Sequence, residues 1–340
     1  MLRTLVGSLI LLVVVSGCWN APAKPEVTVY AALDREFSEP ILRDFETQEQ
    51  IHVAAKYDVE STKTVGLVTA IIQEQNRPRC DAFWNNEILH TLRLEKLGLL
   101  APFEFDGSDE WPAEMRSPSG TWYGLAARAR VLIVNTERLK DRAAPTSILD
   151  LTDPAWKNEC GLAKPLFGTT ATHAAVLFAA WGDDKAKQFF RDVQQNAQVL
   201  SGNKQVALAV GSGQITWGLT DTDDAIIEQE QGRPVEIIYP DQGEGELGTL
   251  MIPNTLVLLK GSPHPKEALA LARYIYEAKN GVEKRLADGP SAQFPVNPAV
   301  EALPRVAKQQ VRPMAADFPA AAEQWESAAA FLKEVFAAAE

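Results

Sequence analysis

From residue 26 onward, segments typical of strands alternate with segments typical of amphipathic helices. Strand-like runs at 26–30, 51–57 and 82–84 are each followed by a helical pattern, at 38–48, 62–75 and 86–97. This alternation predicts mostly parallel sheets with helices on both faces. A second series of the same kind begins at Cys160, and 340 residues are too many for one compact core. We therefore expect an α/β fold with two lobes.

Two apolar strand-like segments mark where the chain passes between the lobes. One, Arg130–Val134, leaves the first series, and the other, at 249–259, returns to it. They predict two crossover strands. We expect lobe 1 to comprise 26–132 plus 247–296 and lobe 2 to comprise 133–246 plus 297–340.

The N-terminus carries an export signal. Arg3 precedes an apolar run from Leu5 to Val15, and small residues then lead to Cys18. The run is shorter than the roughly 20 residues of a membrane span, so 1–17 reads as a signal peptide. The segment resembles the lipobox of bacterial lipoproteins, which implies that Cys18 is lipidated and that 18–25 form a tether; an ordinary signal with a chance cysteine is the alternative. We expect a lipid-anchored protein of the cell envelope, on the periplasmic face in a Gram-negative cell or the outer face in a Gram-positive one.

Charge and reactive residues exclude several classes of function. The net charge of −12 argues against nucleic acid or an anionic membrane surface as a partner. The four histidines have no metal-binding spacing, and no nucleophile motif accompanies them. Cys80 and Cys160 could form a disulfide in an oxidising compartment. Because each begins a predicted strand in a different lobe, too far from the other for a bridge, we expect two buried free thiols. These patterns favour a binding protein that is not an enzyme and has no cofactor.

An acidic cluster follows a strand-like segment in the second lobe. Asp221, Asp223 and Asp224 lie where that strand ends and a helix begins, which is the ligand edge of an open α/β sheet. Carboxylates suit hard cations or amines. Alternatively, these acids cap the helix.

Two further helix starts carry hydroxyl residues. Ser61, Thr62 and Lys63 open one helix, and Thr169 and Thr170 open another. Exposed N–H groups at a helix start bind anions. Plain N-capping by the same hydroxyls is the alternative.

An arginine pair and an amide complete the candidate site. We expect Arg128 and Arg130 to lie on opposite faces of their strand, so that only Arg128 faces the ligand, where it could grip an anion. A buried ion pair of Arg128 with an acid such as Asp34 is the alternative. Asn86 ends its strand and offers both a donor and an acceptor.

Several short motifs follow one another along the chain, at 61–64, 98–102, 127–131, 153–157, and at Asn203 with 206–208. Their order and spacing resemble the ferric-ion substrate-binding lipoproteins of ABC transporters. The resemblance implies the two-lobed type II periplasmic-binding-protein fold with a ligand cleft between the lobes. In that family adjacent tyrosines grip the metal; their positions correspond to Asp223 and Asp224 here. The family histidine and glutamate ligands correspond to Asp34 and Asn86.

These observations together predict a substrate-binding lipoprotein of an ABC importer, acting as a monomer with a membrane permease and its ATPase. The expected ligand is ferric iron or another metal cation, held by Asp34, Asp223 and Asp224, with a bound anion. A small polar organic solute (a phosphonate, carboxylate or amine) is the alternative. A secreted hydrolase would need a nucleophile and base that the sequence lacks, and a structural lipoprotein would need a cleft lined by apolar residues.

Replacing Cys18 with serine tests the lipid anchor. The Cys18→Ser variant should leave the membrane fraction, because the diacylglycerol that anchors the chain attaches to this thiol. Membrane fractionation followed by immunoblotting measures the change. A variant that stays with the membrane as the parent does would exclude lipidation at Cys18.

Overall fold

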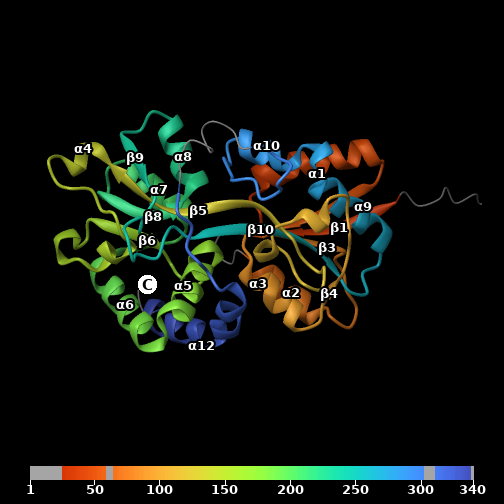
Figure 1. The fold of residues 1–340 in the computed structure, drawn as a ribbon, viewed down its shortest axis with the longest axis horizontal. Helices are drawn as coiled ribbons and strands as arrows, with labels where there is room; N and C mark the ends of the chain where they lie inside the picture. Colours follow the sequence, from red (N-terminus) through yellow and green to blue (C-terminus); the bar gives the residue numbers. More distant parts are fainter. Residues whose placement is uncertain (1–24, 59–63, 302–310, 338–340) are drawn as a thin grey trace, which may run out of the picture.

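The computed structural model describes residues 25–58, 64–301 and 311–337. The chain forms two α/β lobes joined by strands β5 and β10 (Figure 1). This arrangement confirms the predicted fold class. No helix within the described ranges is long and apolar enough to cross a membrane.

Lobe 1 is built on a parallel three-stranded core in the order β2-β1-β3, to which β10 adds an antiparallel strand. Its strands are β1 (Glu26–Ala31), β2 (His52–Tyr57), β3 (Ala82–Asn85), β4 (Leu100–Ala101) and β10 (Met251–Leu259). Its helices are α1 (Arg35–Glu49), α2 (Val65–Gln73), α3 (Leu89–Lys96), α9 (Pro265–Tyr276) and α10 (Val282–Asp288).

Lobe 2 repeats this plan, with parallel strands in the order β8-β6-β7. Its strands are β6 (Cys160–Ala163), β7 (Gln198–Leu200), β8 (Trp217–Asp221) and β9 (Val235–Ile238). Its helices are α4 (Thr136–Leu139), α5 (Gly168–Trp181), α6 (Asp183–Asn196), α7 (Asn203–Gly211) and α8 (Thr222–Glu230), and α12 (Phe318–Ala337) packs beneath them (Figure 1).

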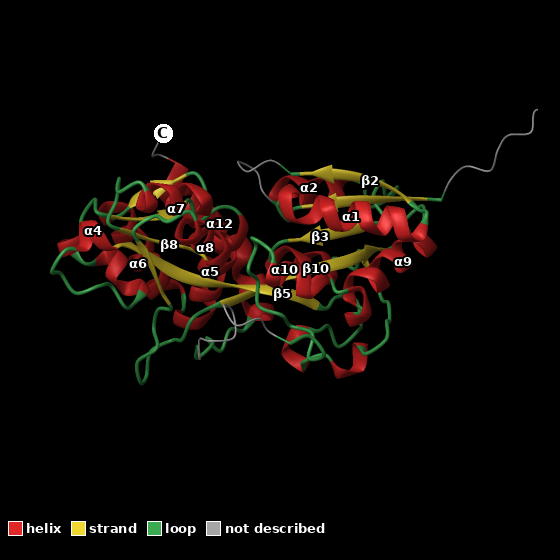
Figure 2. Ribbon diagram, turned by 90° about the horizontal axis from the view of Figure 1, so that it is seen from above, coloured by secondary structure: helices red, strands yellow, loops and turns green. Residues whose placement is uncertain are grey.

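Strand β5 (Gly124–Asn135) runs through both lobes (Figure 2). Its first half pairs with β10 and its second half with β8 and β9, so the two sheets are continuous. The sequence pattern located only 130–134, whereas the strand begins six residues earlier. The small residues Gly124, Ala126 and Ala127 obscured this start, yet all twelve residues of β5 are buried.

Helix α12 connects the two lobes on the face opposite α1 and α8 (Figure 1). It packs most extensively against α5, next against α3 of lobe 1, and least against α6. The predicted lobe boundaries, which give this helix to lobe 2 alone, stay a prediction. Cys80 and Cys160 are both buried free thiols, as the sequence predicted.

A pair of glycines allows α7 to lie close to the lobe 2 sheet. Gly161 of β6 and Gly218 of β8 are neighbours in the register. A Cβ atom on Gly218 would come within 2.4 Å of Val206 Cγ1 on α7 and 3.0 Å of the Gly161 carbonyl oxygen. Because α7 also carries Asn203, this close packing sets the height of a candidate site residue above the sheet.

The Gly218→Ala variant tests that packing. The extra methyl group should force α7 away from the sheet and lower the free energy of unfolding by about 1–3 kcal/mol, the usual cost of overpacking. Urea denaturation measures the change. The Leu208→Ala variant is the control, because that α7 side chain is exposed and its removal should change stability little. Equal stability of both variants and the parent would contradict the close fit.

Candidate functional site

A cleft of about 370 Å³ lies between the two lobes. It collects candidate residues from six separate segments of the chain, most of them at the ends of strands or the starts of helices, with Arg128 within β5. The residues concerned are Asp34, Asn86, Arg128, Thr169, Thr170, Asn203, Asp221, Asp223 and Asp224. Ser61, Thr62, Lys63 and Cys18 lie outside the described residues.

Four helices begin at the wall of this cleft. The residues that precede α1, α5, α7 and α8 are Asp34, Phe167, Gly202 and Asp221, and all four line it. None of the four makes a side-chain hydrogen bond to the first turn of its helix. Each start therefore presents backbone N–H groups and the positive end of a helix dipole at the cleft wall.

The geometry of α5 leaves room for a ligand at its start. Gly168 has a φ of +55°, which a residue with a Cβ atom adopts with strain, and no atom lies within 4 Å of where that Cβ would be. Phe167 before it cannot cap the helix through its side chain. The sequence thus gives an uncapped, sterically open start, which is the condition for anion binding.

The buried pair of Arg130 and Asp221 holds the lobe 2 side of the cleft together. Arg130 is fully buried, and its Nη1 lies 2.6 Å from Asp221 Oδ1. Asp221 Oδ2 accepts hydrogen bonds from Thr169 Oγ1 at 2.6 Å and from Asn203 Nδ2 at 3.0 Å. The carboxylate that ends β8 is therefore committed to β5, α5 and α7, and it does not cap α8.

The same network engages the side chains at two of the helix starts. Arg130 donates to Thr169 Oγ1, to Thr170 Oγ1 and to Asn203 Oδ1 at 3.1–3.3 Å. Thr170 Oγ1 also donates to Asn203 Oδ1 at 3.0 Å. An anion at these starts would accordingly meet backbone N–H groups more readily than hydroxyls. Neither threonine caps α5, so the capping alternative for them is wrong.

The prediction that Arg128 and Arg130 lie on opposite faces of β5 is wrong. Residues two apart on a strand share a face, and both guanidinium groups reach towards Asp221. Arg130 lies deeper, beneath the cleft, and Arg128 lines the cleft itself. The selection of Arg128 as the cleft residue agrees with the structure, although the reason given for it does not.

Arg128 forms an ion pair with the acidic cluster. Its Nε lies 3.0 Å from Asp223 Oδ2, and its Nη1 lies 4.0 Å from Asp221 Oδ2. Burial acts to lower the pKa of Arg128, but Asp223, Asp221, Asp34 and Asp224 together raise it above its ordinary value. Arg128 Nη2 is buried and makes no hydrogen bond with any described residue. One face of this cation is thus available to a ligand.

Three carboxylates lie close enough together to share a cation. One oxygen each of Asp221, Asp223 and Asp224 falls within 4.8 Å of the others. Hard cations prefer such oxygen ligands. Because Asp221 is held by Arg130 and Asp223 by Arg128, a metal at this point would have to compete with two guanidinium groups.

Several cleft residues escaped the sequence reasoning. Phe37 of α1 and Phe167 before α5 add half-buried aromatic surface from opposite lobes. Lys204 on α7 lies 3.7 Å from Glu36 on α1, across the cleft. Nothing in a helical pattern distinguishes such residues from ordinary surface positions, so only the fold could identify them.

No tyrosine lines the cleft, although all six tyrosines fall among the described residues. The hydroxyl of Tyr30 bonds to Glu74, and those of Tyr123 and Tyr276 bond to backbone carbonyls in lobe 1. A phenolate ligand is therefore absent from the cleft in the described conformation. The correspondence of Asp223 and Asp224 to family tyrosines stays a prediction.

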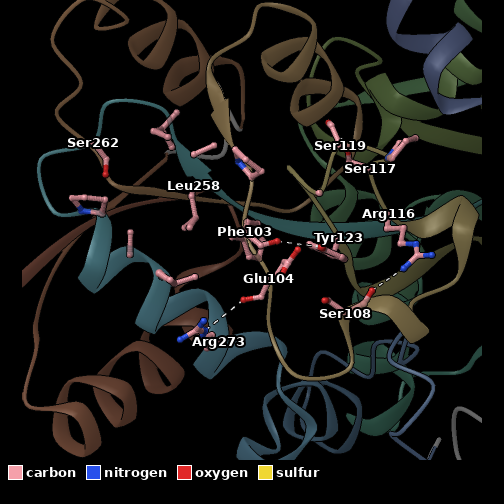
Figure 3. A pocket seen from close by; sticks show the side chains of 18 of the residues that line it. Phe103, Glu104, Ser108, Arg116, Ser117, Ser119, Tyr123, Leu258, Ser262 and Arg273 are labelled. Atoms are coloured by element: carbon pink, nitrogen blue, oxygen red, sulfur yellow. Dashed lines mark hydrogen bonds between the residues drawn. The ribbon is translucent and has the colours of Figure 1, made fainter.

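A larger hollow of about 870 Å³ lies within lobe 1, between β10, α9 and the loops around Phe103 and Arg116 (Figure 3). Arg116 donates to the carbonyl of Ser108, and Arg273 to that of Glu104 at 3.4 Å. None of the predicted site residues that the structure describes lines this hollow. Volume favours this hollow, but the smaller cleft is the better candidate because buried charges and four helix starts meet there.

Comparison with known proteins agrees with this architecture. The family model of bacterial extracellular solute-binding proteins matches residues 91–318. Iron uptake protein A2 of Synechocystis is 28% identical to this chain, in a match that covers 63% of this chain and 64% of that protein. The major ferric iron-binding protein of Neisseria meningitidis is 23% identical, in a match that covers 82% of this chain and 83% of that protein. The fold matches AfuA of Actinobacillus pleuropneumoniae, solved with fructose-6-phosphate bound, at a TM-score of 0.80 and 23% identity, over 93% of this chain and all of that one.

The chain belongs to the bacterial extracellular solute-binding proteins, since the family model covers two thirds of it. Proteins of this family bind small ligands outside the cytoplasm for ABC importers, and the family is one of binding proteins and not a class of enzymes. The resemblance expected from the motifs is confirmed.

Replacing Arg130 tests the network beneath the cleft. The Arg130→Met variant should lose about 3–5 kcal/mol of unfolding free energy, because it leaves the buried Asp221 carboxylate without its cation. Urea denaturation at neutral pH provides the measurement. The Arg43→Met variant is a matched control, since Arg43 pairs with Glu39 on the exposed surface of α1 and should be indistinguishable from the parent. A loss no larger than that of the control would exclude a central role for Arg130.

Proposed function

We propose that this protein captures ferric iron, or another hard cation, together with an anion in the inter-lobe cleft and delivers them to an ABC permease and its ATPase. The observation that carries the proposal is the meeting of three carboxylates with four uncapped helix starts in one cleft. The names of the iron-binding relatives support the choice of cation.

The carboxylates of the cleft would bind the cation, and the helix starts would bind the anion. Asp34, Asp223 and Asp224 supply oxygen ligands to the cation. The N–H groups that open α5 and α7 take the anion, whose charge the helix dipoles stabilise. Arg128 lies between the two sets and balances the carboxylates when the cleft is empty.

An anionic organic solute, such as a phosphorylated sugar, is the second candidate. The acids are already paired with Arg128 and Arg130, and no tyrosine supplies a phenolate to iron. Phe37 and Phe167 offer apolar surface that a bare metal ion does not use. The structural neighbour with fructose-6-phosphate bound supports the same choice.

The location and partners follow from the family and from the N-terminal motif. The protein would be held outside the cytoplasm by the lipid on Cys18, with the tether of 18–25 between lipid and lobe 1. It would act as a monomer, closing on one ligand and docking on the permease.

The Asp223→Ala/Asp224→Ala double variant separates the two candidates. If the ligand is a cation with an anion, calorimetric titration with ferric nitrilotriacetate and phosphate should show affinity more than tenfold weaker, because each charged contact contributes about 1.5–3 kcal/mol. Binding of fructose 6-phosphate should be unchanged, because Arg128 and the helix starts would hold that ligand.

We also expect no visible iron–phenolate band in the parent loaded with ferric iron.

The Asp183→Ala/Asp184→Ala variant is the control, because these acids likewise occupy the first turn of a helix but lie outside the cleft. It should bind as the parent does. A parent that binds fructose 6-phosphate and not iron would establish the second candidate. A strong visible band would contradict the absence of tyrosine from the site.

A further inference from the structure

Glu87 is a buried carboxylate directly behind the cleft wall. It follows Asn86, which lines the cleft, but is itself fully buried and does not reach it. Glu87 accepts hydrogen bonds from Leu89 N at 2.6 Å and His90 N at 3.2 Å, the first N–H groups of α3. Asn85 Nδ2 donates a third at 2.9 Å. These three bonds keep Glu87 in place within lobe 1.

The fourth hydrogen bond to Glu87 comes from the other lobe. Thr172 Oγ1 on α5 donates to Glu87 Oε2 at 2.7 Å, and both residues are fully buried. Thr172 lies two residues beyond Thr170, which lines the cleft. Each lobe therefore contributes one short segment with a residue at the cleft and another at this contact: Asn86 with Glu87, and Thr170 with Thr172.

The electrostatics make this contact sensitive to the separation of the lobes. Burial raises the pKa of Glu87, and the hydrogen bonds from Thr172, Asn85 and the α3 backbone oppose that effect. The neighbouring His90 is neutral, since burial and Arg93 lower its pKa to about 3. Because no cation among the described residues is paired with Glu87, this side chain depends on its four hydrogen-bond donors. Separating the lobes would remove one donor and admit water.

We propose that the Glu87–Thr172 hydrogen bond is a contact that couples closure of the lobes to occupation of the cleft, with both residues acting as positioning residues. The bond favours the arrangement of the lobes in which Asn86 and the start of α5 lie close together, and a ligand that contacts both favours the same arrangement. The loss of that bond then accompanies release. The inference rests on ligand binding in the cleft, as proposed above, and holds for either candidate ligand.

The Thr172→Val variant removes the hydroxyl and keeps the shape of the side chain. In the ligand-free protein we expect a larger radius of gyration by small-angle scattering. With ferric nitrilotriacetate plus phosphate, or fructose 6-phosphate, we expect dissociation about tenfold faster with an unchanged association rate, because one of the four hydrogen bonds to Glu87 is lost. The Thr172→Ser variant, which keeps the hydroxyl, should restore both values.

The Thr216→Val variant is the matched control. Thr216 is also buried and donates to a carboxylate, Glu159 at 2.8 Å, but within lobe 2 and outside the cleft. It should change neither the radius nor the dissociation rate. A Thr172→Val protein with the parent's radius and dissociation rate would overturn the proposal. If the parent binds neither probe, the proposed function fails while the ligand-free radius still decides this inference.

Discussion

The ion pair between Arg130 and Asp221 is the interaction on which the rest of the site depends. It connects β5, the strand that runs through both lobes, to the end of β8. Through Thr169 and Asn203 it also fixes the starts of α5 and α7. A buried guanidinium and carboxylate must satisfy each other's charge and hydrogen bonds. This ion pair therefore fixes the positions of the first turns of α5 and α7 relative to β5.

This arrangement gives the cleft a mixed character. Aspartates near Arg128 make it receptive to a cation, whereas the helix starts and the arginine itself make it receptive to an anion. A site that combined only carboxylates would suffer strong repulsion when empty, and Arg128 relieves that repulsion. This mixed character is the reason for proposing either a cation bound together with an anion or an anionic organic solute as the ligand.

Much of the fold and the membership of the cleft could be predicted from the sequence. Strand ends followed by helices locate Asp34, Asn86, Thr169 and Asp223 at one edge of two sheets, because parallel strands direct their carboxyl ends the same way. The binding roles of these residues stay predictions.

The partners of each side chain could not be predicted in this way. The commitment of Asp221 to Arg130 depends on how β5 pairs with β8, a contact across 91 residues of sequence. The pairing of Glu87 with Thr172 depends on the approach of the two lobes. Neither contact produces a pattern of spacing that could be recognised in the sequence.

Hydrogen–deuterium exchange with and without ligand tests most directly whether the inter-lobe cleft is the binding site. The protein would be compared alone, with ferric nitrilotriacetate and phosphate, and with fructose 6-phosphate. The account predicts that a bound ligand slows exchange at the first turns of α1, α5, α7 and α8, whose N–H groups border the cleft. Protection confined to the hollow around Phe103 and Arg273 would contradict it.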